Sequence, residues 1–195
     1  QEKLKVKFVK VQQKNFLENV ISNEDYKFLK TRLKNDGYEE WYFVVWFMTA
    51  TGARVSELLQ IKAEHITAGH LDIYTKGGKI RRLYIPQILK NEAVVWLRSK
   101  GISSGYIFLN RFGKRITTRG IAQQLKHFAD KYGLKREVVY PHSFRHRFAK
   151  NFLDRFNDIA LLADLMGHES IETTRIYLRR TATEQRAIVD KVVTW

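Results

Sequence analysis

The feature that most constrains the fold of this sequence is a run of large apolar side chains in its first third. Residues 39–50 include the string WYFVVWFM, from Trp41 to Met48. A helix that is apolar on every side has to be buried in a protein core or in a bilayer, and this run is far shorter than the roughly 18 residues that a membrane span needs. We therefore predict a helix over residues 39–50 at the centre of the core, with aromatic rings filling the space around it.

Start and stop signals of further helices flank this run. Ser22 opens the string SNED, which offers a capping box, and apolar residues at helical spacing follow it until Gly37. A proline is well tolerated at the first position of a helix, so Pro141 indicates that a helix begins there. Apolar residues at helical spacing predict three more helices, over residues 89–100, 121–132 and 158–166.

The only strong strand signal is a hairpin. Residues 71–75 (LDIYT) and 81–85 (RRLYI) alternate between apolar and polar side chains, and the string KGGK lies between them. Glycines supply the positive φ angles that tight hairpin turns require. The chain is therefore predicted to be mainly α with a small antiparallel β-sheet, an α+β fold.

Composition indicates a nucleic-acid partner. The chain has 35 Lys and Arg against 20 Asp and Glu, a net charge of +15, and no cysteine. Such a charge favours a polyanionic partner, although a solvated surface or a ribosome-associated protein would also explain it. The absence of cysteine argues against a disulfide scaffold and a thiolate nucleophile. The first residues are charged and do not resemble a signal peptide, so we expect a soluble protein of the cytoplasm.

The stretch from Pro141 to Tyr177 concentrates side chains suited to phosphate chemistry. His142, Arg145 and His146 lie three and four residues apart, so they share one face of the helix that Pro141 starts. Arginine can bind two phosphate oxygens at once, and imidazoles can donate hydrogen bonds or move protons. Spacing of four would also suit a helical zinc site, but the glutamate of the HExxH motif is absent, and no GxSxG string indicates a serine hydrolase.

Two further segments complete this set. Gly167 and His168 follow the helix predicted over residues 158–166, and Tyr177 comes nine residues after His168. Upstream, the string TGARVSELLQI places Arg54 and Glu57 three residues apart on a helix, where the carboxylate can orient the guanidinium. Taken alone, that pair would be an ordinary surface salt bridge.

The strings TGARVSEL, HSFRH and LMGH, with a tyrosine nine residues after the last histidine, resemble the tyrosine recombinase (phage integrase) family. The resemblance covers residues 22–195 and implies the catalytic-domain architecture of that family. It divides the chain into a connector at 1–21, which would follow a missing amino-terminal domain, a catalytic domain at 22–180 and a carboxy-terminal helix at 181–195. Ile188 and Val192 belong to an apolar stripe on that helix, which could fold back on its own domain or dock on another protomer.

The resemblance also implies a mechanism. Tyr177 would attack a DNA phosphate and form a 3′-phosphotyrosyl bond, with His142 as the proton acceptor or relay and Lys76 as the general acid for the leaving 5′ oxygen. Arg54, Arg145 and His168 would neutralise the phosphate oxygens, and Glu57 would hold Arg54 in place. No metal, ATP or other cofactor is implied.

The implied partners are double-stranded DNA and further copies of the chain, as a tetramer on synapsed DNA. Basic residues of the hairpin and of the string RFGKRITTR are the candidates for DNA-backbone contacts, with a solvated loop as the alternative: Lys79, Arg81, Arg82, Arg111, Lys114, Arg115 and Arg119. The function implied is that of a site-specific recombinase or integrase of a mobile element, acting at the nucleoid. A type IB topoisomerase-like enzyme and an inactive DNA-binding module are the alternatives.

Overall fold

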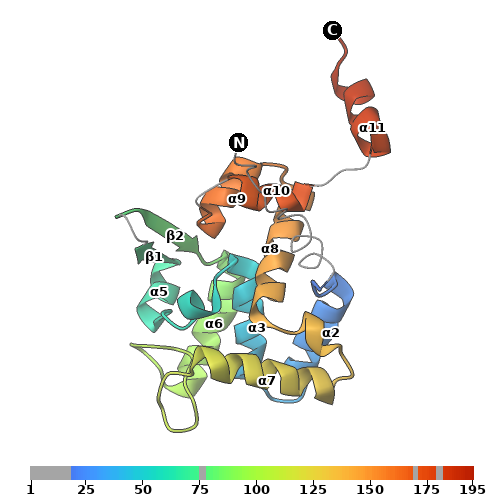
Figure 1. The fold of residues 1–195 in the computed structure, drawn as a ribbon. Coiled ribbons are helices and arrows are strands. Elements are labelled where there is room, and N and C mark those ends of the chain that lie inside the picture. The colour runs from blue at the N-terminus through green and yellow to red at the C-terminus, as the bar shows by residue number, and fades with distance from the viewer. Residues whose placement is uncertain (1–18, 75–77, 169–170, 179–181) are drawn as a thin grey trace, which may run out of the picture.

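The computed structural model describes residues 19–74, 78–168, 171–178 and 182–195. It is mainly helical, and Figure 1 shows the helices gathered around α3 (Glu39–Thr51). The other helices are α2 (Asn23–Asn35), α4 (Val55–Leu58), α5 (Ala63–Ala68), α6 (Gln87–Lys100), α7 (Thr118–Lys131), α8 (Pro141–Arg155), α9 (Ile159–Met166), α10 (Ile171–Arg175) and α11 (Ala182–Val192). Two short 3₁₀ helices are η1 (Arg136–Val138) and η2 (Ile176–Leu178).

Helix α3 is the centre of the core, as its sequence predicts. Its side chains from Tyr42 to Thr49 are all buried, and α2, α6 and α8 pack against it. Phe43 stacks on Trp96 of α6 with ring centroids 4.5 Å apart, and Phe47 meets Phe108 edge to face at 5.7 Å. Aromatic packing of this kind fixes the helices that carry the site.

The predicted helix boundaries agree closely with the structure. The Ser22 hydroxyl accepts a hydrogen bond from the Asp25 N–H at 3.1 Å and caps α2. Pro141 occupies the first turn of α8, as predicted. The Asp158 carboxylate caps α9 at 2.9 Å, and Gly167 ends that helix with a φ of +71°. This left-handed conformation is one that glycine adopts without strain.

The predicted hairpin is present, shifted by about one residue. Strands β1 (His70–Tyr74) and β2 (Ile80–Tyr84) pair antiparallel, with Leu71 opposite Leu83 and Ile73 opposite Arg81. Lys76, the predicted general acid, lies outside the described residues. The hairpin packs its inner face against α9 and α5.

The two ends of the described chain differ. Ile21, just before the predicted domain boundary, is fully buried; its N–H donates to the Ser143 hydroxyl and its carbonyl accepts from Arg147, both at 2.8 Å. By contrast, every residue from 182 to 195 is exposed, and Figure 1 shows α11 extending away from the other helices. The apolar residues of α11 therefore do not fold back on this domain in the structure. No helix in the described part of the chain is both long enough and apolar enough to cross a bilayer.

Candidate active site

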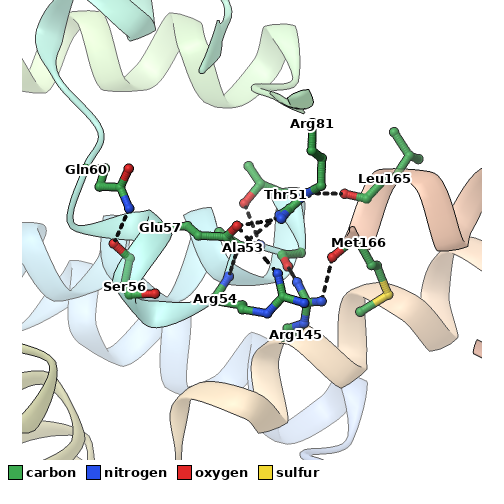
Figure 2. Close-up of polar contacts among 11 residues, drawn as sticks. Thr51, Ala53, Arg54, Ser56, Glu57, Gln60, Arg81, Arg145, Leu165 and Met166 are labelled. Carbon is green, nitrogen blue, oxygen red and sulfur yellow. Dashed lines mark hydrogen bonds and ion pairs between the residues drawn. The ribbon is translucent and has the colours of Figure 1, made fainter. Parts of the chain in front are cut away.

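Helix α8 places Arg145 at the centre of a cluster of positively charged side chains. The Arg145 side chain is buried and donates to the carbonyl of Gly52, at the end of α3, and to that of Met166, at the end of α9, the latter at 2.7 Å (Figure 2). These bonds use two of the five N–H donors of a guanidinium. The pKa of Arg145 falls to about 10 because the group is buried and because Arg54 is near. An anion would relieve both effects.

Arg54 joins the same cluster from the turn between α3 and α4. Its backbone N–H donates to Glu57 Oε1 at 2.7 Å, and its guanidinium Nη1 lies 3.6 Å from Glu57 Oε2. Glu57 is buried, whereas the Arg54 side chain is about two-fifths exposed, 39 %. Glu57 therefore holds the backbone of Arg54 firmly and leaves its guanidinium open to a ligand.

Arg81 also belongs to this cluster, where it is buried, whereas the sequence predicts that it contacts the DNA backbone. Its guanidinium grips both oxygens of Glu57, with Nη1 at 2.5 Å from Oε2 and Nη2 at 3.0 Å from Oε1. Its Nε donates to the carbonyl of Leu165 at 3.1 Å. Figure 2 shows Arg81 reaching down between α4 and α9. These bonds give Arg81 a set of partners inside the protein, and its predicted contact with DNA stays a prediction.

His168, in the turn after α9, lies near Arg145 and Arg54 of this cluster. The His168 N–H donates to the Ala163 carbonyl at 3.0 Å, which closes the helix end, and its Nδ1 shares a hydrogen bond with the buried Thr174 hydroxyl at 2.6 Å. Burial, followed by the positive charges of Arg145 and Arg54, lowers the pKa of His168 to about 4. At neutral pH the ring is therefore uncharged, with its orientation fixed through Nδ1.

Tyr177 lies in η2 and packs against α8. Its ring joins a small apolar cluster built on Ala149, Leu153, Leu162 and Met166. Its hydroxyl shares a hydrogen bond with Nδ1 of His146, the residue that follows Arg145 on α8. Burial raises the pKa of the Tyr177 phenol, and Arg145 opposes that rise. The candidate nucleophile and the central arginine are thus neighbours within one protomer.

The partner of the Tyr177 phenol differs from the expected one. The family resemblance implies that His142 accepts the proton of Tyr177, but the structure gives this contact to His146. His142 lies one turn earlier on α8, with its ring centroid 6.2 Å from that of His146, and is the more exposed of the two. Partial burial, Arg145 and Arg54 lower the pKa of His142. The pKa of His146 falls to about 4, chiefly because the ring is buried.

The sequence of this chain matches a profile of the phage integrase family over residues 18–184. The chain belongs to the phage integrase family.

Curated relatives within this family are tyrosine recombinases. Tyrosine recombinase XerA of Pyrococcus furiosus is 37 % identical over 154 residues, which are 76 % of this chain and 53 % of the relative. Tyrosine recombinase XerC of Pseudomonas entomophila is 32 % identical over 72 % of this chain and 48 % of its own length. This integrase-family chain therefore spans about half the length of the curated relatives it matches.

Solved structures of the family share the fold. The crystal structure of XerA recombinase superposes with a TM-score of 0.72 at 23 % identity, covering 90 % of this chain and 65 % of that one. The Tn1549 transposon integrase in complex with transposon right end DNA gives 0.72 at 18 % identity, covering 90 % and 66 %. The catalytic domain of bacteriophage HP1 integrase gives 0.60 at 17 % identity, and here the alignment covers 89 % of this chain and 94 % of that domain.

The remaining basic residues predicted to touch DNA lie on the surface of this integrase-family domain. Lys79 is exposed on the hairpin, and Arg82 pairs with Asp72 of β1 at 2.8 and 3.1 Å on its outer face. Residues 111–117, which we call the exposed basic loop, carry the exposed cations Arg111, Lys114 and Arg115, and Arg119 is exposed in the first turn of α7. Their roles in DNA binding remain predictions.

His146 belongs to the site although no role was predicted for it from the sequence. Its position four residues after His142 places it on the same face of α8 as His142, and this spacing is the signal in the sequence that it belongs to the site. Its pairing with Tyr177 depends on how η2 packs on α8, 31 residues further along the chain. The described residues contain no group of three or more His, Asp or Glu side chains that could hold a metal ion.

Proposed function

We propose that this chain is the catalytic domain of a site-specific DNA recombinase, which cuts and rejoins DNA strands through a covalent 3′-phosphotyrosyl bond. The observation that carries the proposal is the placement of the Tyr177 hydroxyl against His146, the residue after the buried Arg145 on α8. Arg145 is close enough for its positive charge to act on the Tyr177 phenol. A tyrosine beside buried, bonded arginines is suited to attack an anion that those arginines hold. The Tn1549 integrase structures, which are complexes with transposon DNA, support the choice of substrate class.

In the first step, the Tyr177 oxygen forms a bond to phosphorus and the bond from phosphorus to the 5′ oxygen breaks. With the ring proton of His146 on Nε2, Nδ1 accepts the phenol proton as the attack proceeds. Lys76, a residue assigned through the family resemblance, supplies a proton to the departing 5′ oxygen. His142, which the family resemblance assigns as proton acceptor or relay, lies one helical turn before His146, with ring centroids 6.2 Å apart.

Three side chains stabilise the charge that develops at phosphorus. Arg145 has three N–H donors beyond those used by Gly52 and Met166, Arg54 has an open guanidinium, and His168 has Nε2 on the side away from Thr174. Because the carbonyls and Glu57 already hold these groups in place, they need little reorganisation when the phosphate enters. Glu57 supports Arg54, as its sequence spacing predicted.

Rejoining to a different strand requires a 5′-hydroxyl from another duplex and therefore more than one protomer. The exposed apolar residues of α11, which include Ile188 and Val192, suit docking on a neighbouring copy, and we propose a tetramer on paired DNA sites. The likeness to the Tn1549 transposon integrase and the bacteriophage HP1 integrase favours a mobile-element integrase. Such an enzyme would act on DNA in the cytoplasm.

The test is a trapping assay in EDTA. A library of duplexes carries random sequence around a nick, so that the 5′-hydroxyl fragment diffuses away after cleavage and the covalent complex survives denaturation. We expect adducts with the unaltered chain and with Tyr140→Phe, a matched control that removes a neighbouring phenol, but none with Tyr177→Phe. Adduct formation by Tyr177→Phe, or none by the unaltered chain while it binds the same DNA, contradicts the proposal.

A second assay separates recombinase from topoisomerase-like activity. Sequences recovered from the trapped adducts are placed in two duplexes of different length, and in a supercoiled plasmid. A recombinase yields hybrid duplexes that depend on the recovered sequence. Relaxation of plasmids that lack the sequence, without hybrid products, would favour the topoisomerase-like alternative.

A further inference from the structure

Adjacent arginines on β2 have opposite environments. The Arg81 side chain is 5 % exposed and pairs with the buried Glu57. The Arg82 side chain is 46 % exposed and pairs with Asp72 on the outer face of the hairpin. Successive side chains of a strand point to opposite faces, so one residue step separates these environments. The two residues share chemistry and location, which makes Arg82 a natural control for Arg81.

The bonds of Arg81 join two parts of the site that are far apart in sequence. Toward α4, it holds both oxygens of Glu57, and Oε1 of Glu57 also accepts the backbone N–H of Arg54. A buried, bidentate arginine–carboxylate pair fixes both direction and distance. Arg54 is thus held by a carboxylate whose own position depends on Arg81.

Toward α9, Arg81 holds the turn that carries His168. Its Nε donates to the Leu165 carbonyl at 3.1 Å. A Cβ placed on Gly167 would lie 2.6 Å from Arg81 Cδ and 2.9 Å from its Nη1, so the arginine lies directly against the backbone of that glycine. His168 is the next residue along the chain. The same guanidinium therefore sets the place of the turn before His168 and that of the carboxylate behind Arg54.

We propose that Arg81 is a positioning residue for strand cleavage, which holds Arg54 through Glu57 and His168 through the Leu165–Gly167 turn in a fixed relation around the phosphate. The inference rests on the proposed function for its role in cleavage. A misplacement of catalytic groups by about 1 Å can slow a reaction by about 10²-fold, so this role is open to measurement. A direct phosphate contact would instead change DNA affinity and its dependence on salt.

The experiment compares Arg81→Lys with Arg82→Lys. Both keep the positive charge, but lysine cannot bind both oxygens of Glu57 and the Leu165 carbonyl at once. With protein in saturating excess over the trapping duplex, we expect Arg81→Lys to form adducts about 10²-fold more slowly, with an unchanged Kd and salt dependence. Arg82→Lys, which alters a guanidinium on the outer face of the hairpin, should slow adduct formation far less than Arg81→Lys.

A second measurement does not require cleavage. The Cε1–H cross-peak of the His168 ring, assigned with a His168→Asn variant, reports the surroundings of His168 in free protein. We expect Arg81→Lys to shift this peak and Arg82→Lys to leave it in place. If the unaltered chain formed no adduct, the proposed function would fail while this peak still tested the positioning of His168.

A role in stability alone is distinguished by temperature. Adduct rates are compared well below the melting temperatures of both variants, where the population of unfolded chain is negligible. A slow Arg81→Lys under those conditions supports positioning. Adduct formation at the unaltered rate, or an unmoved His168 peak, would overturn the inference.

Discussion

Two groups of cations carry the same charge but are held in different ways: the buried arginines around Glu57, and the cations of the exposed basic loop. Arg81 and Arg145 donate to carbonyls and to Glu57 inside the protein. Arg111 and Arg115 instead lie over the rings of Phe112 and Tyr106, at 4.8 and 4.5 Å from the ring centroids. Buried donors that are already in place can stabilise a transition state, whereas exposed ones contribute salt-sensitive binding.

The comparison teaches that charge alone does not assign a role in this fold. Two arginines, Arg54 and Arg81, pair with one carboxylate, Glu57, and the charge of Glu57 opposes the fall in the pKa of Arg145 that these arginines cause. The positive charge of Arg145 is stabilised by hydrogen bonds to the backbone carbonyls of Gly52 and Met166.

The largest effect is expected for Arg145→Lys. Lysine keeps the charge but cannot bond both the Gly52 and Met166 carbonyls and still present donors to a phosphate. By analogy with the loss of one oxyanion donor, the adduct rate should fall by about 10²- to 10³-fold. Single-turnover trapping at saturating protein measures it, and a rate within about threefold of the unaltered chain would place Arg145 outside the chemistry.

The next effect concerns pH. His146 and His168 have pKa values of about 4 in the folded protein, below the usual 6.5 that they regain on unfolding. The unfolded chain therefore binds more protons between these values, and the stability that the two neutral rings contribute above pH 6.5 is lost as the pH falls toward 4.

The expected slope is up to about 1.4 kcal/mol per pH unit for each histidine. Urea unfolding between pH 7 and 4.5 measures it, with His146→Gln as the comparison because that variant removes one of the two titrations. The free energy of unfolding of His146→Gln should fall less steeply with decreasing pH. Equal slopes in the two proteins would show that His146 does not titrate as the structure implies.

Gly167→Ala should break the packing of Arg81 against the turn before His168. The φ of Gly167 is +71°, and the added Cβ would lie 2.6 Å from Arg81 Cδ. The left-handed conformation costs a non-glycine residue about 1–2 kcal/mol, and displacement of Arg81 adds to it. Gly37→Ala is the control, because its φ is +84° with nothing within 4 Å of the added Cβ. Denaturant unfolding should show the larger loss for Gly167→Ala, and equal losses would contradict the packing.

The smallest effect on chemistry is expected in the exposed basic loop. Replacing Arg111, Lys114 and Arg115 together by alanine should leave the saturated adduct rate unchanged. If these residues bind phosphates, the slope of log K against log salt should fall by about 0.9 for each phosphate that is no longer neutralised. Binding titrations at several salt concentrations measure the slope. An unchanged slope would mean that the loop is simply solvated.

Much of this fold was predictable because local signals agree with tertiary packing. The apolar run of α3, the proline that starts α8 and the glycine that ends α9 each act within a few residues. The sequence also identified Arg54, Arg145, His168 and Tyr177 as members of one site through the family motifs. The structure brings these four residues, which come from separate segments, into one cluster.

The burial of Arg81 was not predicted, although the hairpin contained the signal. On β2, Arg81 shares its face with the buried Leu83, and Arg82 shares the exposed face with Tyr84. Period two therefore places Arg81 inward, against the expectation that a basic residue near a hairpin tip faces solvent. What it binds there could not be read from the sequence, because Glu57 and Leu165 are 24 and 84 residues away.

The measurement that tests the account most directly is the identification of the residue that carries DNA. The trapped complex is digested with nuclease and protease, and the peptide bearing a residual nucleotide is sequenced by mass spectrometry. We predict a single modified residue, Tyr177, linked through its phenol oxygen to a 3′-phosphate. Attachment to any of the other eight tyrosines, or through a 5′-phosphate, would contradict the mechanism built on the Tyr177–His146 contact.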